Sequence, residues 1–342
     1  MTDVTVMGAG IFGLSVAWAC ARRGARVRVI DPNGPGAGVS GGLVGALAPH
    51  VPENWNDKKA FQFESLVMAE GFWAEVAAAG GVQPGYARLG RIQPVMDESG
   101  LALARARETG AAALWQGKAA WRVEPAGGEW CPESPTGHVI RDTLSARLHP
   151  RRACEALVAA LRARGSEVVR EGPLEGRVLW ATGVAGLQEL SAATGRTAGN
   201  GVKGQAALLA LDARAAPQLF VDGVHVVPHA DGTTAVGSTS ERDYDDPATT
   251  DAQLDDVIAR ACAAVPALAA APVIERWAGL RPRARSRAPM LGAHPLRHGE
   301  FIANGGFKIG FGMAPKVAKA MAELMLDGVD RIPDGFRPEA SL

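Results

Sequence analysis

The pattern of apolar and polar positions in the first 31 residues predicts a strand, a helix and a second strand. An apolar run at Val4–Met7 is followed by a helical pattern over 14–23, a stop at Gly24 and an alternating run over 26–30. This order and spacing are typical of a βαβ unit, in which two parallel strands are joined by a helix. The pattern therefore predicts an α/β fold at the start of the chain.

The rest of the chain mixes helical and strand-like patterns. Glycine-rich residues 32–48 show neither period, so we expect a loop that wraps a ligand. Residues 81–140 are rich in turns, and we expect a strand there at 88–95. Helices are predicted over 58–79, 150–164, 250–265 and 314–327, and further strands at 178–183, 224–227, 234–237, 273–280 and 300–303.

These elements predict a mixed α/β chain, α+β overall, with two domains. The first is a Rossmann-type nucleotide-binding domain of the glutathione-reductase-like kind, and the second is an antiparallel-sheet substrate domain inserted into it. We expect the nucleotide-binding domain to be discontinuous in sequence. Its predicted segments are 1–48, 142–200 and 285–342, and those of the substrate domain are 49–141 and 201–284.

Charge and cysteine content narrow the range of partners. The chain has 36 Lys and Arg residues and 36 Asp and Glu residues, so its net charge is zero. The electric field of the whole protein therefore favours binding to neither nucleic acid nor acidic membranes. The four cysteines lie far apart without zinc-site spacing, which favours a reducing compartment. No signal region precedes the first strand, and the longest apolar runs are too short to span a bilayer. We therefore expect a cytoplasmic protein without a metal site.

Gly8, Gly10 and Gly13 form a GxGxxG pattern between the first strand and the first helix. Glycines at these positions allow a tight turn, a close approach of the backbone to a pyrophosphate, and close packing of helix and strand. Asp31 follows Gly13 by 18 residues, a spacing that suits a hydrogen bond to a ribose hydroxyl. The combination predicts a site for FAD or NAD rather than NADP.

Seven segments, spread over almost the whole chain, resemble the family of FAD-dependent amino-acid and amine oxidases. This family includes D-amino-acid oxidase, glycine oxidase and monomeric sarcosine oxidase. Each segment is weak by itself, but their order along the chain is specific. The segments are VTVMGAGIFGLSVAWACARRGARVRVID at 4–31, SGGLVGALAPH at 40–50, VLWATG at 178–183, GVKGQ at 201–205, VHVVPHADGTTAVGSTSE at 224–241, WAGLRP at 277–282 and NGGFKIGFGMAP at 304–315.

The resemblance implies a set of flavin contacts in glycine-rich loops that follow strands. No cysteine occurs in 277–315, where sarcosine oxidase attaches its flavin, so we expect non-covalent FAD. The implied FAD-binding residues are Gly8, Gly10, Ile11, Phe12, Gly13, Asp31, Ser40, Gly41, Gly42, Val169, Ala181, Gly183, Gly306, Phe307, Lys308 and Gly310.

Two cations match residues that hold the substrate carboxylate in the family. Arg281 in WAGLRP matches the carboxylate-clamping arginine of glycine and D-amino-acid oxidases, and a guanidinium fork fits both carboxylate oxygens. Lys308 in GGFK matches the lysine with the same task in sarcosine oxidase. The alternative for each residue is an ordinary solvent-exposed cation.

Two histidines are further candidates. His225 occupies the position of an active-site tyrosine of glycine oxidase, so the role of that hydroxyl is in doubt here. An imidazole is able to hydrogen-bond a substrate or carry a proton, although a purely structural histidine is an equal alternative. His50 in ALAPH matches a histidine near the flavin in glycine oxidase.

Two other motifs have competing explanations. Residues 38–42 fit the GxSxG elbow of serine hydrolases, but the preceding DPNGPGAG is not the strand that the elbow requires. RPRARSR at 281–287 packs four arginines into seven residues, which suits either a solvated rim or recognition of a polyanionic substrate or RNA. Zero net charge and the absence of aromatic residues in that stretch disfavour RNA.

Two rival functions also use a dinucleotide site. The second glycine loop at 34–42 and the GGFK segment disfavour a nicotinamide-dependent dehydrogenase, which needs neither. Arg281 and Lys308 disfavour a flavin-carrying electron-transfer subunit, because two cations facing the flavin suit an anionic substrate.

The resemblance therefore implies an FAD-dependent oxidase of a small amino acid or N-substituted glycine. Such an enzyme transfers a hydride to flavin N5 and releases an imine or oxo acid, with molecular oxygen as acceptor and hydrogen peroxide as product. The alternative is an FAD-dependent dehydrogenase, or a tRNA-modification-type oxidase, that acts on a larger carboxylated amine. The sequence predicts neither the substrate nor the oligomeric state.

Overall fold

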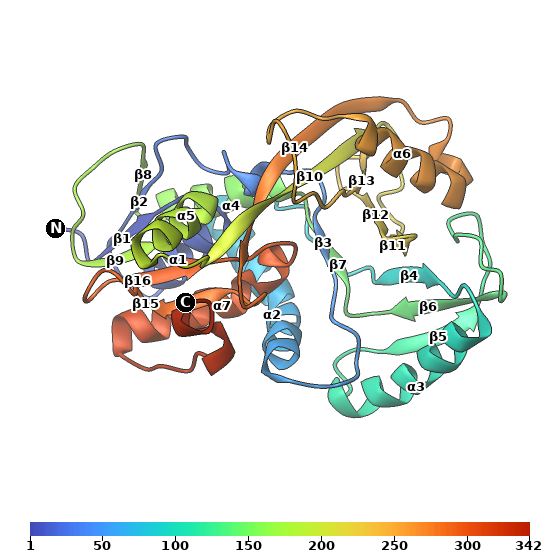
Figure 1. Ribbon diagram of the computed structural model, residues 1–342, viewed down its shortest axis with the longest axis horizontal. Helices are drawn as coiled ribbons and strands as arrows, with labels where there is room; N and C mark the ends of the chain where they lie inside the picture. Colours follow the sequence, from blue (N-terminus) through green and yellow to red (C-terminus); the bar gives the residue numbers. More distant parts are fainter.

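The computed structural model describes residues 1–342 and contains two large β-sheets with helices packed on both (Figure 1). The first sheet has six strands in the order β15-β16-β9-β1-β2-β8. All neighbours in it are parallel except β15 and β16. The strands are β1 (Val4–Met7), β2 (Val27–Ile30), β8 (Glu167–Val169), β9 (Arg177–Trp180), β15 (Met290–Ala293) and β16 (Phe301–Asn304).

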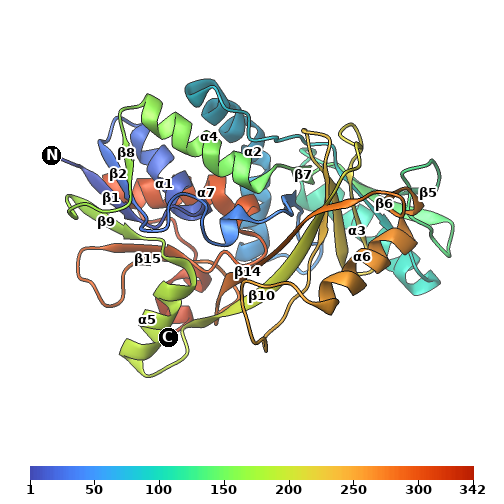
Figure 2. The same ribbon diagram turned by 90° about the horizontal axis from the view of Figure 1, so that it is seen from above.

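Helices cover both faces of the six-stranded sheet. Successive residues of its strands point to opposite faces, and apolar residues occur on both faces. Leu291 and Ala303 face the core that contains α1 and α7. Their neighbours Met290 and Ile302 face the other side and pack with Leu187 of α5. Figure 2 shows α1, α7, α4 and α2 above this sheet and α5 below it. The helices are α1 (Ile11–Ala21), α2 (Asp57–Gly80), α4 (Pro150–Ala163), α5 (Gly183–Thr194) and α7 (Gly310–Asp327).

The second sheet has eight strands in the order β14-β10-β13-β12-β11-β4-β6-β5. It is antiparallel except for the β11–β4 pair. The strands are β4 (Arg91–Pro94), β5 (Trp121–Pro125), β6 (His138–Asp142), β10 (Gly199–Leu209), β11 (Gln218–Val221), β12 (Val224–Pro228), β13 (Thr234–Gly237) and β14 (Val273–Ala284). A separate two-stranded sheet pairs β3 (Ala46–Leu47) with β7 (Ala146–Arg147).

The two faces of the eight-stranded sheet have different neighbours. Val226 and Val236 pack with Leu254 and Val257 of α6 (Ala252–Ala264). The adjacent residues Val227 and Ala235 turn the other way and pack with Leu43 and Ala206, beside the glycine-rich loop. This second face therefore looks toward the nucleotide-binding segments.

The long strands β10 and β14 extend from the six-stranded sheet region to the second sheet (Figure 1). They run antiparallel from the Gly199–Ala284 pair to the Leu209–Val273 pair. Because both strands border the space between the sheets, side chains on them reach the region where the glycine-rich turns converge.

The mixed α/β fold class and the initial βαβ unit are confirmed, as are the four predicted helices to within a few residues. The strand predicted at 273–280 continues to Ala284, and the helix predicted from 314 begins at Gly310. Helix α5 was not predicted, since its segment was assigned only a turn after the strand. The division into two domains stays a prediction, and α2, assigned by it to the substrate domain, packs with α4 and α7.

The strand expected at 88–95 is present as β4, but three other elements of 81–140 were not predicted. They are helix α3 (Glu98–Leu114) and strands β5 and β6. Helix α3 buries only Leu101, Ala104 and Ala111, so its apolar stripe is too small to produce a clear helical period. Its start was nevertheless visible in the sequence, because Asp97 is an N-cap whose carboxylate accepts a hydrogen bond from the Gly100 N–H at 2.7 Å.

No helix of the chain is both long enough and apolar enough to cross a membrane. Four short 3-10 turns complete the structure. They are η1 (Val39–Gly41), η2 (Pro266–Leu268), η3 (Asp334–Phe336) and η4 (Pro338–Ala340).

The Asp97→Ala variant tests whether the cap holds the start of α3. We expect the free energy of unfolding to fall by about 1 kcal/mol, because the N-terminal N–H groups lose their acceptor. Asp97→Asn keeps an acceptor oxygen and serves as the matched control, with a smaller loss. Chemical unfolding of the three proteins measures the effect, and equal stability of Asp97→Ala and wild type would contradict the assignment.

Candidate active site

A cavity of about 740 Å³ lies between the two sheets. Its wall is formed by the first glycine turn, the loop over 37–44, the end of β9, part of β14 and the segment over 303–311. Among its lining residues, Asp31 is the only acid, and Arg281 and Lys308 are the only lysine or arginine residues. A cavity of this size with few charged groups is typical of a site for a small molecule or cofactor.

In the first glycine turn, neighbouring main-chain atoms lie so close that no side chain fits at Gly8 or Gly13. Gly8 has a φ of +105°, and a Cβ there would lie 2.4 Å from the Ala181 carbonyl oxygen. A Cβ on Gly13 would lie 1.9 Å from the Gly8 carbonyl oxygen, which fixes α1 close to β1. Gly8 therefore lets the chain after β1 pack against the chain after β9. Gly13 lets the first turn of α1 pack closely on the end of β1.

Two helices begin at the cavity wall, α1 at Ile11 and α7 at Gly310. The residues that precede them, Gly10 and Ile309, provide no side-chain cap, and neither helix has an acidic residue in its first turn. The free N–H groups and the positive end of each helix dipole therefore favour a negatively charged ligand. Ser40 supports the start of α1, since its Oγ accepts a hydrogen bond from the Ile11 N–H at 3.0 Å.

Asp31 ends β2 at the rim of the same turn. Its carboxylate accepts hydrogen bonds from the Ala9 N–H at 2.8 Å and the Asn33 N–H at 3.0 Å. These bonds fix the orientation of the carboxylate and leave lone pairs free. Asp31 is thus able to accept a further hydrogen bond from a ligand hydroxyl in the cavity.

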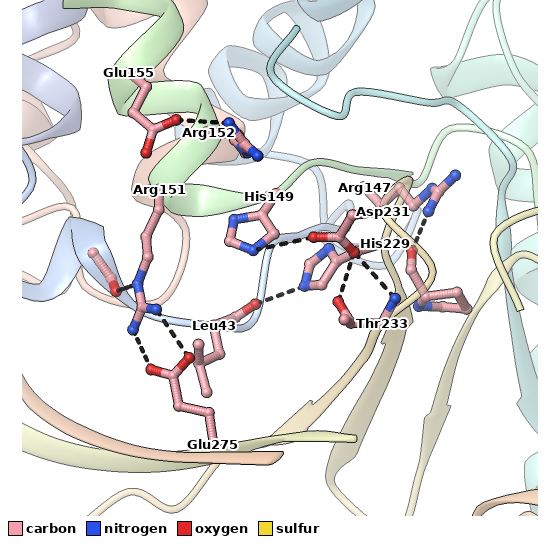
Figure 3. Close-up of polar contacts among 12 residues, drawn as sticks. Leu43, Arg147, His149, Arg151, Arg152, Glu155, His229, Asp231, Thr233 and Glu275 are labelled. Atoms are coloured by element: carbon pink, nitrogen blue, oxygen red, sulfur yellow. Dashed lines mark hydrogen bonds and ion pairs between the residues drawn. The ribbon is translucent and has the colours of Figure 1, made fainter. Parts of the chain in front are cut away.

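Two side chains outside the cavity lining bind the main chain at residues 41 and 43 (Figure 3). Arg151 donates from Nε to the Gly41 carbonyl at 2.7 Å and pairs with Glu275 of β14 at 2.6 Å. Nε2 of His229 lies 2.9 Å from the Leu43 carbonyl oxygen. Because both anchors bind main-chain carbonyls, they set the backbone position of the loop rather than any one side chain.

His229 lies against a second histidine in Figure 3. The rings of His149 and His229 are 4.6 Å apart, and Nε2 of His149 lies 3.9 Å from the Asp231 carboxylate. Burial, together with the nearby His149, lowers the pKa of His229 to about 4. Burial also lowers the pKa of His149. Both rings are therefore uncharged at neutral pH.

The side chain of Arg281 extends across the neighbouring strand β10 toward the cavity. Its guanidinium lies so close over Gly204 that a Cβ there would be 1.7 Å from Nη1. Nη1 donates to the Thr239 carbonyl at 3.1 Å, and only 7% of the residue is exposed. Burial lowers the pKa of Arg281 to about 10, with Glu241 opposing the shift. The guanidinium is therefore charged at neutral pH and fixed in direction.

A buried polar network compensates this charge. Gln205 donates from Nε2 to Glu241 at 3.0 Å, and the Thr239 hydroxyl also donates to the Glu241 carboxylate. Lys203, which is 2% exposed, lies 3.6 Å from Glu241 and 3.2 Å from Asp251. Two acids thus balance two buried cations, which limits the cost of placing Arg281 away from water.

Lys308 has no comparable partner. Its side chain lines the cavity and is exposed, so it stands at the opening. Surrounding protein lowers the pKa of Lys308 by removing part of its water, and the charges of Arg281 and Arg283 lower it further. The charges of the two cations that line the cavity therefore influence each other.

Most of the predicted site residues line this cavity, and five do not. The ones that line it are Gly8, Gly10, Ile11, Phe12, Asp31, Ser40, Gly42, Ala181, Gly183, Arg281, Gly306, Phe307, Lys308 and Gly310. Gly13, Gly41, Val169, His50 and His225 are outside the lining. Gly13 and Gly41 instead pack on the main chain of Gly8 and Gly36, and Val169 accepts a hydrogen bond from the Asp31 N–H at 3.1 Å.

His225 lies two strands from β10, which borders the cavity. His225, Gly237 and Ala206 are opposite one another on β12, β13 and β10, and Ala206 lines the cavity. The centroids of the His225 and Phe220 rings are 4.6 Å apart, and Nδ1 of His225 has no hydrogen-bond partner. Burial, together with the charges of Arg91 and Lys308, lowers the pKa of His225 to about 3. The ring is therefore neutral.

His50 is tied to α2 rather than to the cavity. Its N–H donates to the Gln62 side-chain oxygen at 2.7 Å, and its Nδ1 contacts the same oxygen. Gln62 also donates to the Ala48 carbonyl at 3.2 Å. These contacts fix the loop before α2, which is a structural role.

Sequence analysis missed several residues at or behind the site. Trp277 and Asn304 line the cavity, and both occur in segments that carried the family resemblance. The polar network was visible only as charged or polar residues at alternate positions, 203 and 205 on one strand and 239 and 241 after another. Because that spacing also fits solvent-exposed strand positions, tertiary structure was needed to assign it.

The chain matches the DAO family, described as FAD dependent oxidoreductase, over residues 3–324. It belongs to this family. The family membership agrees with the glycine turn, the acid at the end of β2 and the uncapped helices at the cavity, and it makes the protein an FAD-dependent oxidoreductase whose cofactor is FAD.

Relatives in the family are similar over nearly their whole length. A glycine oxidase from Pseudomonas putida is 28% identical over 99% of both chains, and one from Geobacillus kaustophilus is 24% identical over 94% of this chain and 92% of its own. The crystal structure of the Geobacillus kaustophilus glycine oxidase has a TM-score of 0.84 at 20% identity and covers 98% of each chain. That of an iminodiacetate oxidase from Chelativorans sp. has a TM-score of 0.83 at 21% identity and covers 98% of this chain and 99% of its own. At this identity the structural likeness shows the fold.

The residues of the cavity fit FAD. Gly10 and Gly306 leave a cradle that side chains would fill, since a Cβ would lie 3.3 Å from the Ser40 Oγ in the first case and 2.9 Å from Phe12 in the second. The N-terminus of α1 suits the pyrophosphate, and Asp31 suits a ribose hydroxyl. No cysteine lines the cavity, and all four cysteines are free.

The neutral state of His229 makes a pH-dependent stability prediction. Its pKa is lower in the folded chain than the usual 6.5, so folding favours the neutral ring, and this contribution is lost as pH falls from about 6.5 toward 4. In His229→Gln, whose amide still donates to Leu43, the loss of unfolding free energy should be smaller by up to about 1.4 kcal/mol per pH unit.

Chemical unfolding over this pH range measures the effect. His298→Gln, at an exposed histidine, is the control and should follow wild type. An identical pH dependence for His229→Gln and wild type would show that His229 does not titrate on unfolding.

Proposed function

We propose that the protein is an oxidase that converts a small amino acid or N-substituted glycine into an imine. The substrate loses two electrons and two protons, and dioxygen takes them up as hydrogen peroxide. Water then adds to the imine and releases an oxo acid together with ammonia or the smaller amine. The names of the related glycine oxidases and of the iminodiacetate oxidase support this class of substrate.

The observation that carries the proposal is the pair of cations, Arg281 and Lys308, in a cavity whose only acid is Asp31. Asp31 belongs to the nucleotide end, beside the first glycine turn. The other end is therefore positive and suits one carboxylate bound by both cations. An amine with an α-carboxylate fits this arrangement, because its C–N bond lies next to the bound group.

The chain contributes orientation and charge. Arg281 is held by Thr239 and by the flat surface of Gly204, so its donors point in one direction before substrate arrives. Binding a carboxylate there positions the α-carbon, and such positioning lowers the entropic cost of reaction. FAD, when bound, supplies the redox chemistry as a two-electron acceptor.

His225 has a supporting part in the proposal. Its ring is neutral, and it lies on the cavity face of the sheet, opposite Gly237. A neutral imidazole with an unpartnered nitrogen is able to accept a hydrogen bond through ordered water. The low pKa argues against His225 as a proton carrier between protonated and neutral forms at neutral pH.

The first experiment is an anaerobic titration of the FAD-loaded protein with glycine, sarcosine, D-alanine and D-proline. Loss of visible flavin absorbance with one of these amines is the expected result, and admission of oxygen should restore the absorbance and produce hydrogen peroxide. Bleaching by none of a wider set of carboxylated amines would contradict the proposal. Bleaching without recovery in oxygen would favour a dehydrogenase.

Arg281→Ala tests the carboxylate clamp. Loss of this buried cation should raise KM for the bleaching substrate by about 30-fold or more, equivalent to roughly 2–5 kcal/mol. Arg281→Lys keeps the charge and should recover part of the loss. The flavin spectrum reports whether the variant still folds around FAD, and an unchanged KM in a folded, FAD-loaded Arg281→Ala protein would show that the clamp is assigned incorrectly.

A further inference from the structure

Four basic side chains beside the cavity opening have no acidic partner. We call Lys58, Arg242, Arg283 and Arg287 the outer cations, because none of them lies within 4.0 Å of a carboxylate oxygen. At the opposite end of β14, Arg276 lies 2.8 Å from Asp255 and Glu275 lies 2.6 Å from Arg151. Ion pairs therefore occupy the end of β14 that is far from Arg283.

Arg283 connects this cluster to the cavity wall. Its guanidinium carbon is 5.3 Å from the centre of the Phe307 ring, and Nζ of Lys308 is 5.8 Å from the same centre. Phe307 lines the cavity, and its N–H donates to the Pro282 carbonyl at 3.0 Å. Two positive charges therefore meet at one aromatic ring on the cavity wall.

The remaining outer cations extend the positive region outward. Nζ of Lys58 donates to the Arg287 carbonyl. Burial lowers the pKa of Arg283, and the charges of Arg287 and Arg242 also lower it. Acids occur on the loop that follows β13, at Asp243, Asp245 and Asp246, but none of them forms an ion pair.

Like charges held this close repel one another unless an anion joins them. A single substrate carboxylate accounts for Arg281 and Lys308 and leaves the outer cations without a counterion. We propose that Arg283 and the other outer cations form a second anion subsite at the cavity opening, and that the substrate is a small amine with two anionic groups. An N-carboxymethyl glycine or another aminodicarboxylate has this chemistry. The inference rests on the oxidase function proposed above.

A small dianion fits the site better than a nucleic acid does. Recognition of single-stranded nucleic acid relies on aromatic rings that stack with bases. The aromatic ring within the cluster, Phe307, already contacts Arg283 and Lys308. The cavity beyond it is lined by the apolar residues Val44, Ala206 and Trp277, which suit a compact substrate.

Two pairs of compounds isolate the contribution of the second charge. Iminodiacetate is sarcosine with a second carboxylate, and glutarate and butyrate are the corresponding analogues in which a methylene replaces the amine. The analogues cannot be oxidised as amines, so calorimetric titration of the FAD-loaded protein measures binding alone. We expect glutarate to bind at least about tenfold more tightly than butyrate, and iminodiacetate to have a correspondingly lower KM than sarcosine.

Variants assign the preference to the subsite. Arg283→Gln should lose most of the preference for glutarate while leaving butyrate affinity unchanged, because it removes only the outer charge. Arg283→Lys keeps the charge and should retain the preference. Arg285→Gln is the matched control, at an exposed arginine of the same segment without a side-chain contact, and should behave as wild type.

Equal affinity for glutarate and butyrate would overturn the second subsite, and oxidation of sarcosine in the same preparation would leave the proposed oxidase function intact. Failure of all four compounds to bind or bleach the flavin would overturn both proposals. Displacement of glutarate by a short single-stranded RNA, with tighter binding of the RNA, would identify the outer cations as a nucleic-acid surface and overturn the dianion proposal.

Discussion

The buried charge of Arg281 is the constraint on which the architecture of the site depends. A guanidinium removed from water is stable only if nearby acids and acceptors compensate it. Here Glu241 and the Thr239 carbonyl come from the segment after β13, while Gln205, which holds Glu241, comes from β10. Because Arg281 belongs to β14, three neighbouring parts of one sheet must keep their register for its charge to be compensated. The same register directs the guanidinium across Gly204 toward the cavity.

The wall of the cavity opposite β14 relies mainly on main-chain groups. The N-termini of α1 and α7 face the cavity, and apart from the Ile11 N–H, which donates to Ser40, their first N–H groups are available to a negatively charged ligand. Glycine is required where these turns touch β9 and where α1 meets β1. Arg281 on β14, Lys308 just before α7 and the main-chain donors of the two helices thus share one cavity. This arrangement suits a cofactor and a carboxylated substrate that bind side by side.

Histidines in this protein mostly support the site by staying neutral. His229 donates from Nε2 to the Leu43 carbonyl next to the glycine-rich loop, and His149 packs against His229. His225 occupies a similar neutral environment on the cavity face of the sheet. Burial favours the uncharged form of each ring, so these residues behave as polar packing elements whose contribution depends on pH. The cationic groups that line the cavity are Arg281 and Lys308.

The local sequence determined the βαβ start, the nucleotide turn and most helices, because these depend on near neighbours: glycine spacing, apolar period and a terminal acid within 31 residues. It also determined Arg281 and Lys308 as candidates through the segments in which they occur. Helix α3 escaped prediction because its apolar stripe consists mainly of alanines that only the packed sheet identifies as buried. Whether His225 and His50 line the cavity, and which acids compensate Arg281, depended on strand register between segments far apart in the chain. Local pattern sets which element a residue occupies, whereas burial and partners arise only when distant elements pack together, and this is why the tertiary structure alone decided them.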